Sequence, residues 1–170
     1  TSILWKLYMD HLHHLSNLLS ARSSVLDALD FIINESRVIL DSSNISYLIP
    51  ILVSYLQKIR RPSAVTATVG DHNYQQQMHQ HQPNDDNENN RAIKLLFDLS
   101  RISNGRQIIG DKLSTWSQVL IVFKQYFYDS RKSVSVATQD ALQRSLLDPP
   151  KPGPLLSSWA HCFEHILLPL

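Results

Sequence analysis

The side chains best placed to do chemistry in this sequence lie near its C-terminal end. His161 and His165 are four residues apart, with Cys162 between them. Two histidines at this spacing share one face of a helix and can hold zinc, and a thiolate could join them. Helical spacing instead turns Cys162 toward the apolar stripe of Phe163 and Ile166, and the chain has no second cysteine. We therefore expect histidines on a polar helix face and no metal site.

Other residues offer even less chemistry. The remaining histidines of interest are His11, His13 and His14 in the first helical pattern, and His79 and His81 in a low-complexity stretch. The chain has no G-x-S-x-G nucleophile motif and no glycine-rich phosphate loop, and the paired acids Asp85 and Asp86 fall in sequence expected to be disordered. The sequence predicts no catalytic, cofactor-binding or metal-ligating residue, no cofactor, and hence no enzyme.

Composition excludes further classes. Lys and Arg number 16 and Asp and Glu 15 among 170 residues, so the chain lacks the basic excess of a nucleic-acid binder. A single cysteine cannot form an internal disulfide, which favours a reducing, cytoplasmic setting. No apolar run approaches the roughly 18–20 residues that span a bilayer, and the amphipathic N-terminal stretch is unlike a signal peptide. Only four glycines argue against a turn-rich β fold.

Apolar residues at helical spacing predict an all-α fold. Pro50 lies inside one pattern and predicts a kink or a late helix start there. The inward positions expected in the N-terminal block are Leu4, Leu7, Tyr8, Leu15 and Leu18, then Val25, Ala28, Leu29, Ile32 and Ile33, then Ile45, Leu48, Ile49, Leu52, Leu56 and Ile59. Those in the C-terminal block are Ile93, Leu96, Phe97 and Ile102, then Trp116, Val119, Leu120, Phe123 and Phe127, then Val134, Ala137, Ala141 and Leu142, then Trp159, Cys162, Phe163, Ile166, Leu167 and Leu170.

Three parts follow from this pattern. Residues 1–61 are expected to be N-terminal helical repeats, and residues 91–170 C-terminal helical repeats. Between them, residues 62–90 are rich in Gln, His and Asn and poor in large apolar side chains, which predicts a disordered insertion in a surface loop. Both chain ends lack the polar residues usual at a natural terminus, so we expect a fragment truncated at both ends.

A residue pattern that occurs twice in the C-terminal block favours a repeat architecture. Trp116 and Trp159 are each followed by apolar residues at offsets of three, four and seven, and they are 43 residues apart. HEAT and armadillo units repeat at roughly 40–47 residues. The sequence therefore predicts a HEAT/armadillo-like solenoid. Trp5, Trp116 and Trp159 are expected in its core, with partner anchoring as the alternative.

A charge cluster marks one predicted helix start. Asp129 is followed by Arg131 and Lys132, which oppose the helix dipole in a first turn. The cluster is either a solvated helix start or a contact between repeats in which an acid from elsewhere offsets the cations.

Residues 91–170 resemble a known family, the helical domains downstream of the Sec7 domain in large Arf guanine-nucleotide exchange factors. Within it, the Golgi brefeldin-A-resistance or Gea subgroup is the most similar. The resemblance is carried by Trp116, the helix start Asp129-Ser130-Arg131-Lys132-Ser133-Val134, the run Ala141-Leu142-Gln143-Arg144-Ser145-Leu146-Leu147, and the segment from Trp159 through Cys162 and Phe163 to Leu168-Pro169-Leu170.

The resemblance implies a non-catalytic regulatory segment. In that family the Sec7 domain catalyses exchange, and no counterpart of it is present here, so only the parent protein is expected to be an exchange factor. The implied partners are Arf- or Rab-type GTPases or other domains of the same protein, with peripheral association at Golgi membranes and no nucleic acid. The alternative is a HEAT-repeat adaptor or transport scaffold with no GTPase role.

Overall fold

The computed structural model describes residues 2–35, 40, 42–57, 83–102, 114–149 and 156–168. Every regular element in these ranges is helical, so the prediction of an all-α fold is confirmed for them. The helices are α1 (Ser2–Ser16), α2 (Arg22–Asp30), α3 (Ser42–Leu56), α4 (Pro83–Ser100), α5 (Thr115–Tyr126), α6 (Lys132–Leu147) and α7 (Leu156–Cys162). The 3-10 turn η1 (Leu19–Ala21) precedes α2, and the π-helical segments η2 (Phe31–Glu35) and η5 (Phe163–Leu167) extend α2 and α7.

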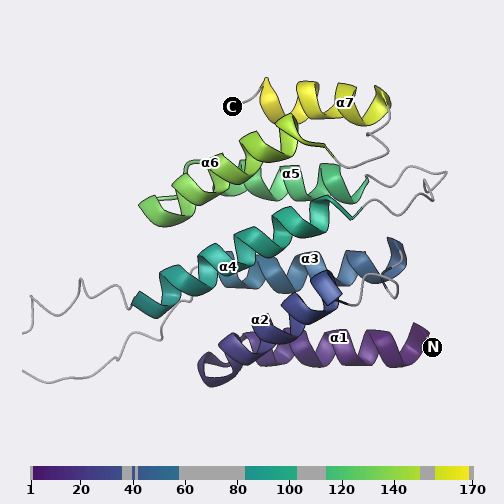
Figure 1. The fold of residues 1–170 in the computed structure, drawn as a ribbon, viewed down its shortest axis with the longest axis vertical. Helices are drawn as coiled ribbons and strands as arrows, with labels where there is room; N and C mark the ends of the chain where they lie inside the picture. Colours follow the sequence, from purple (N-terminus) through teal and green to yellow (C-terminus); the bar gives the residue numbers. More distant parts are fainter. Residues whose placement is uncertain are drawn as a thin grey trace, which may run out of the picture.

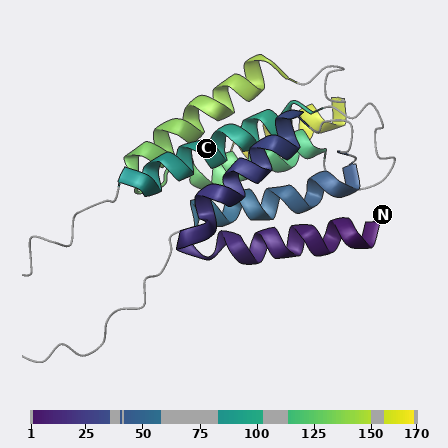
Figure 2. The ribbon, with the colours of Figure 1, turned by 60° about the horizontal axis from the view of Figure 1, so that its bottom comes forward.

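The helices form two layers of a stack. Helices α1, α3, α5 and α7 lie side by side in one layer, and α2, α4 and α6 cross them in the other (Figure 1). The view in Figure 2 shows the second layer lying over the first. Consecutive pairs α1–α2, α3–α4 and α5–α6 each form a hairpin. The substantial helix contacts of the described chain stay within one hairpin or join it to the next.

One apolar cluster runs through the whole stack. Leu26, Leu52, Leu96 and Phe123 are fully buried members from four different helices. Pro50 lies inside α3, which begins at Ser42, so the late helix start that Pro50 suggested is not observed. Because Pro50 is exposed, the helix can pass it with its ring on the solvent side.

Most of the predicted inward stripe of α1 is wrong, although Leu15 does pack against the core. Its buried positions are Trp5 in part, then Met9, Leu12 and Ser16, whereas Leu4, Leu7 and Tyr8 of the predicted stripe are exposed. Leu18, also predicted inward, lies exposed beyond the end of α1. Apolar side chains occupy more than half of the circumference of α1, and only the side toward α2 and α3 is covered. Periodicity alone could not decide which part of so wide an arc faces the core.

Helix α4 begins earlier than the sequence suggested. Residues 83–90 were assigned to the disordered insertion, but they form the first turns of α4. Pro83 suits the first position of a helix, and Asp85 and Asp86 suit the positive end of its dipole. Glu88 and Asn89 are buried, so these turns are part of the packed structure. The rest of the predicted insertion, residues 62–82, lies outside the described residues.

Arg22 of α2 is buried near the end of α3 and contacts residues of three other helices, α1, α3 and α4. Arg22 of α2 donates from Nε to Oε2 of Glu88 at 2.8 Å and from Nη1 to the carbonyl of Ser16 at 3.2 Å. Its guanidinium lies 4.2 Å from the ring centre of Tyr55, whose hydroxyl donates to the Arg22 carbonyl at 2.8 Å. Burial raises the pKa of Tyr55, which keeps its hydroxyl a donor. We call Arg22, Glu88, Tyr55 and the carbonyl of Ser16 the Arg22 cluster.

A second arginine reaches the same end of α3 from the third hairpin. Arg131 pairs through Nε with Asp129 at 2.9 Å, and its Nη2 donates to the carbonyl of Leu56, the last residue of α3. Nearby, Ser133 donates to Asp86 of α4 at 2.7 Å. Of the two alternatives for the Asp129 charge cluster, the contact between repeats is observed at the Leu56 carbonyl, but the acid that pairs with Arg131 is the local Asp129 and not one from elsewhere. Carbonyls at a helix C-terminus have no partner within the helix, so a cation from another hairpin is stabilising there.

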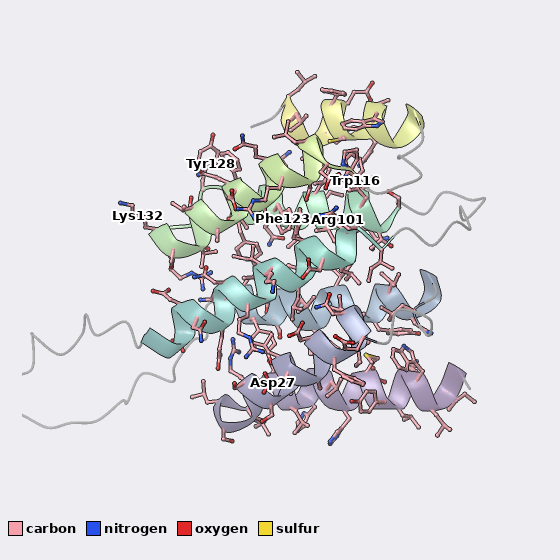
Figure 3. The ribbon with its side chains drawn as sticks, viewed as in Figure 1. Asp27, Arg101, Trp116, Phe123, Tyr128 and Lys132 are labelled. Carbon is pink, nitrogen blue, oxygen red and sulfur yellow. The ribbon has the colours of Figure 1, made fainter. Side chains whose placement is uncertain are left out.

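The burial of the Arg22 cluster predicts that two neighbouring ion pairs contribute very differently to the free energy of unfolding. Both Arg22–Glu88 and Arg91–Asp27 join α2 to α4, but the first is buried and the second is largely exposed, with Asp27 at the surface (Figure 3). Glu88→Ala should lower the free energy of unfolding by about 3–5 kcal/mol, because Arg22 is left buried without its counter-ion. Asp27→Ala should cost less than about 1 kcal/mol. Urea unfolding of both variants measures the difference, and equal costs would show that Arg22 does not depend on Glu88.

Candidate functional site

The predicted histidine pair and cysteine lie together at the last helix. The rings of His161 in α7 and His165 in η5 are 4.6 Å apart between centroids, with His165 exposed and His161 partly buried. No group of three or more His, Cys, Asp or Glu side chains is placed to hold a metal ion in the described parts of the chain. Cys162 is fully buried, and burial raises the pKa of its thiol. A buried, protonated thiol is a poor nucleophile and a poor metal ligand.

A shallow hollow of about 450 Å³ lies beside these histidines, between α5 and α7. Its lining residues are Ile121, Lys124, Gln125, His161 and His165. Lys124 donates from Nζ to the carbonyl of His165 at 2.6 Å, so its ammonium helps to hold η5 on α5. Its polar lining consists of Lys124, Gln125 and the two histidines, with no carboxylate among the lining residues. Because Lys124 Nζ is bound to the His165 carbonyl, this arrangement supports packing of η5 on α5.

The tryptophan echo corresponds to helices of one layer. Trp116 of α5 and Trp159 of α7 contact each other, with ring centroids 5.0 Å apart and planes inclined by 61°. Trp116 is buried, as is Phe123 about two helical turns later in α5 (Figure 3). The Nε1 of Trp116 donates to the Ser145 carbonyl at 3.1 Å. Trp159 is partly buried against the same core. Both tryptophans act in packing between neighbouring hairpins, as expected for core residues.

The most prominent exposed feature is an apolar face of α1. Ile3, Leu4, Leu7 and Tyr8 are 77%, 74%, 60% and 44% exposed and lie on successive turns of one helix. We call these four residues the outer face of α1. Contiguous exposed apolar side chains of this kind mark sites of interaction with other molecules. Sequence reasoning singled out three of them but placed them in the core.

A smaller apolar face lies at the other end of the stack. Phe163 is 51% exposed and Leu168 is 78% exposed, and we call these two residues the outer face of α7. Phe163 was predicted to point inward with Cys162 and Ile166, and this is wrong. Phe163 lies at the edge of that stripe, about 100° around the helix from Cys162. Its ring stacks beside Trp159 at the surface, 6.0 Å between ring centroids, and its carbonyl accepts the π-helical hydrogen bond from the Leu168 N–H at 3.0 Å.

No family model, curated protein or solved structure matches this chain. No helix among the described residues is both long and apolar enough to cross a membrane.

The burial of Cys162 predicts an unreactive thiol. Its reaction with a disulfide reagent near pH 8 should be slower by about two orders of magnitude in the folded chain than in urea, because the reagent must wait for the last helix to open. The raised pKa also has a consequence for stability. The contribution of Cys162 to the free energy of unfolding should be constant through neutral pH and fall above about pH 9, since the thiol then ionises only in the unfolded chain. A thiol that reacts equally fast in both states would contradict the burial of Cys162.

The different burial of Ile166 and Phe163 predicts that their substitution by alanine lowers the free energy of unfolding by different amounts. Ile166→Ala removes a fully buried side chain and should lower the free energy of unfolding by about 2–5 kcal/mol. Phe163→Ala removes a half-exposed ring that only stacks on Trp159, so about 1 kcal/mol or less is expected. Thermal or urea unfolding of the two variants compares them directly. A larger loss of unfolding free energy for Phe163→Ala than for Ile166→Ala would contradict the assignment of that ring to the surface.

Proposed function

We propose that this chain is a non-catalytic scaffold, a segment of a HEAT/armadillo-like solenoid that acts by binding other proteins. The observation that carries the proposal is the stacking of hairpins whose substantial contacts reach only the next hairpin. This is the contact pattern of repeat arrays, in which each unit buries its apolar face against its neighbours. Apolar side chains left exposed at both ends of the stack support binding as the activity.

The particular scaffold that we propose is a regulatory helical segment of a large Arf guanine-nucleotide exchange factor. The support is the resemblance of residues 91–170, which contain α5, α6 and α7. On this proposal the segment acts in Golgi vesicle transport, in the cytoplasm and at the surface of Golgi membranes. Its partners are an Arf- or Rab-type GTPase or another domain of the same protein, and exchange itself is catalysed by the Sec7 domain of the parent protein.

An adaptor or transport scaffold without a GTPase role is the second candidate. The observation that favours it is the burial of residues that carry the resemblance. Trp116, Val134, Ala141 and Leu142 are all buried, so their pattern is explained by packing between helices. Any helical array with the same packing could carry that pattern.

Co-sedimentation with vesicles tests the Arf proposal. The purified chain is mixed with Golgi-like vesicles alone, and with vesicles carrying Arf in its GDP or GTP form. The expected result is recovery of the chain with the vesicles only when Arf is present, because on this proposal the partner is the GTPase and not the lipid. Vesicles carrying an unrelated GTPase of the Ras class are the control. Recovery that does not change with Arf or with its nucleotide would remove the Arf assignment and leave the adaptor.

A further inference from the structure

The repeated tryptophan pattern places a histidine in η5 where α5 has a buried valine. Val122 stands six positions after Trp116 and is buried, whereas His165 stands six positions after Trp159 and has a side chain that is 62% exposed. A position that serves packing in α5 is therefore occupied in η5 by a polar ring. Histidine can donate or accept a hydrogen bond and gains a positive charge in mildly acidic solution.

This histidine borders the hollow between α5 and α7. Helix α5 contacts both α7 and η5, so both sides of the hollow belong to elements that the structure describes. Ile121 of α5 is 38% exposed and supplies an apolar surface. The rings of His161 and His165, with centroids 4.6 Å apart, line the side that α7 and η5 provide. The hollow thus combines one aliphatic surface with a pair of imidazoles.

The charge in the hollow is positive. Lys124 donates to the His165 carbonyl at 2.6 Å, which leaves two of its three ammonium N–H groups for another acceptor. Gln125 adds an exposed amide, and no carboxylate is among the lining residues. Glu164 lies beside the hollow, but its Oε2 is 3.9 Å from Nε2 of His165, which is too far for a hydrogen bond. The lining therefore offers hydrogen-bond donors and a cation without a bonded counter-ion among the described residues.

His161 has an unused nitrogen. Its Nε2 is shielded from solvent and has no hydrogen-bond partner within the described residues. A shielded polar atom without a partner is costly, so a ligand that supplies one gains more there than at a nitrogen that water already satisfies.

We infer that the hollow between α5 and α7 binds an acidic segment of a partner protein. An aliphatic side chain of the segment packs on Ile121, and a neighbouring carboxylate pairs with Lys124 and the two histidines. The inference rests on the proposed role as a protein-binding scaffold and adds the chemistry of the segment that the scaffold recognises.

The lining favours such a segment over a free ion. A small anion would pair with Lys124 but would leave Ile121 uncovered, whereas a side chain next to a carboxylate covers it as well. A metal ion would be repelled by the Lys124 ammonium. In addition, no third His, Cys, Asp or Glu side chain is placed to complete a metal site with the histidine pair in the part of the chain that the structure describes.

Two variants remove the charge that the histidines can gain. His165→Gln changes a largely exposed side chain, and His161→Gln changes the partly buried one. Glutamine keeps a hydrogen-bonding group of similar size but stays neutral at every pH. His14→Gln is the matched control, because His14 is an exposed histidine of α1 and does not line the hollow.

NMR of the histidine ring protons is the measurement, since it reports on the two rings directly and detects weak binding. The probe is a short peptide of alternating leucine and glutamate with both ends blocked, and the matched peptide has glutamine in place of glutamate. The ring signals of His161 and His165, identified by their loss in the two variants, should move on addition of the acidic peptide. The signal of His14 should not move.

The affinity should depend on charge on both sides. The acidic peptide should bind the wild-type chain more tightly at about pH 6 than at about pH 8, because the imidazoles gain charge while glutamate stays ionised. Lys124 stays charged over this range, and Glu164 beside His165 also stays ionised, so the change arises at the two rings. Each of the two histidine variants should weaken binding at about pH 6 by about two- to fivefold, and His14→Gln should not.

Three outcomes would overturn the inference. The first is an acidic peptide that moves neither ring signal. The second is equal affinity for the glutamate and glutamine peptides, or an affinity that does not rise as the pH falls, which would show that charge does not recognise the ligand. The third is inorganic phosphate that binds as tightly as the peptide, which would indicate a site for small anions. Failure of the peptide to bind while Arf still recruits the chain to vesicles would remove this inference and leave the proposed function intact.

Discussion

The buried Arg22 guanidinium is the interaction on which the middle of the structure depends. It brings together the end of α1 through the Ser16 carbonyl, the end of α3 through Tyr55, and α4 through Glu88. A cation that has lost its water is stable only when its partners stay in place, so this contact fixes how the first two hairpins meet. Arg131 adds the third hairpin at the Leu56 carbonyl. The C-terminal end of α3 is therefore the point where three hairpins are joined.

Around this point the substantial contacts among the described helices join neighbouring hairpins, and the hollow between α5 and α7 is shallow. The outer faces of α1 and α7 carry large apolar side chains that are exposed. These side chains support the proposed role in binding, because exposed apolar patches mark interaction surfaces.

Much of the C-terminal half could be predicted because each of its apolar stripes is narrow. Trp116, Leu120 and Phe123 are buried as expected, and the Trp159 echo corresponds to a real contact with Trp116. The burial of Phe163 was predicted wrongly because this residue lies at the edge of its stripe, about 100° around the helix from Cys162, where periodicity does not decide whether a neighbouring element covers it. Glu88 was missed because it lies in a run of Asn and Asp that is typical of disorder, and its partner is 66 residues away.

The sequence by itself determined that this chain is helical and where most of the helices lie, because those properties depend on local spacing and capping. It also indicated a repeat through the tryptophan spacing. Only the tertiary structure decided which side of α1 is buried, since that depends on the positions of α2 and α3 and α1 is apolar on both sides. It likewise decided that Glu88 is a counter-ion inside the fold, because a charge can be buried only where its partner lies close in space.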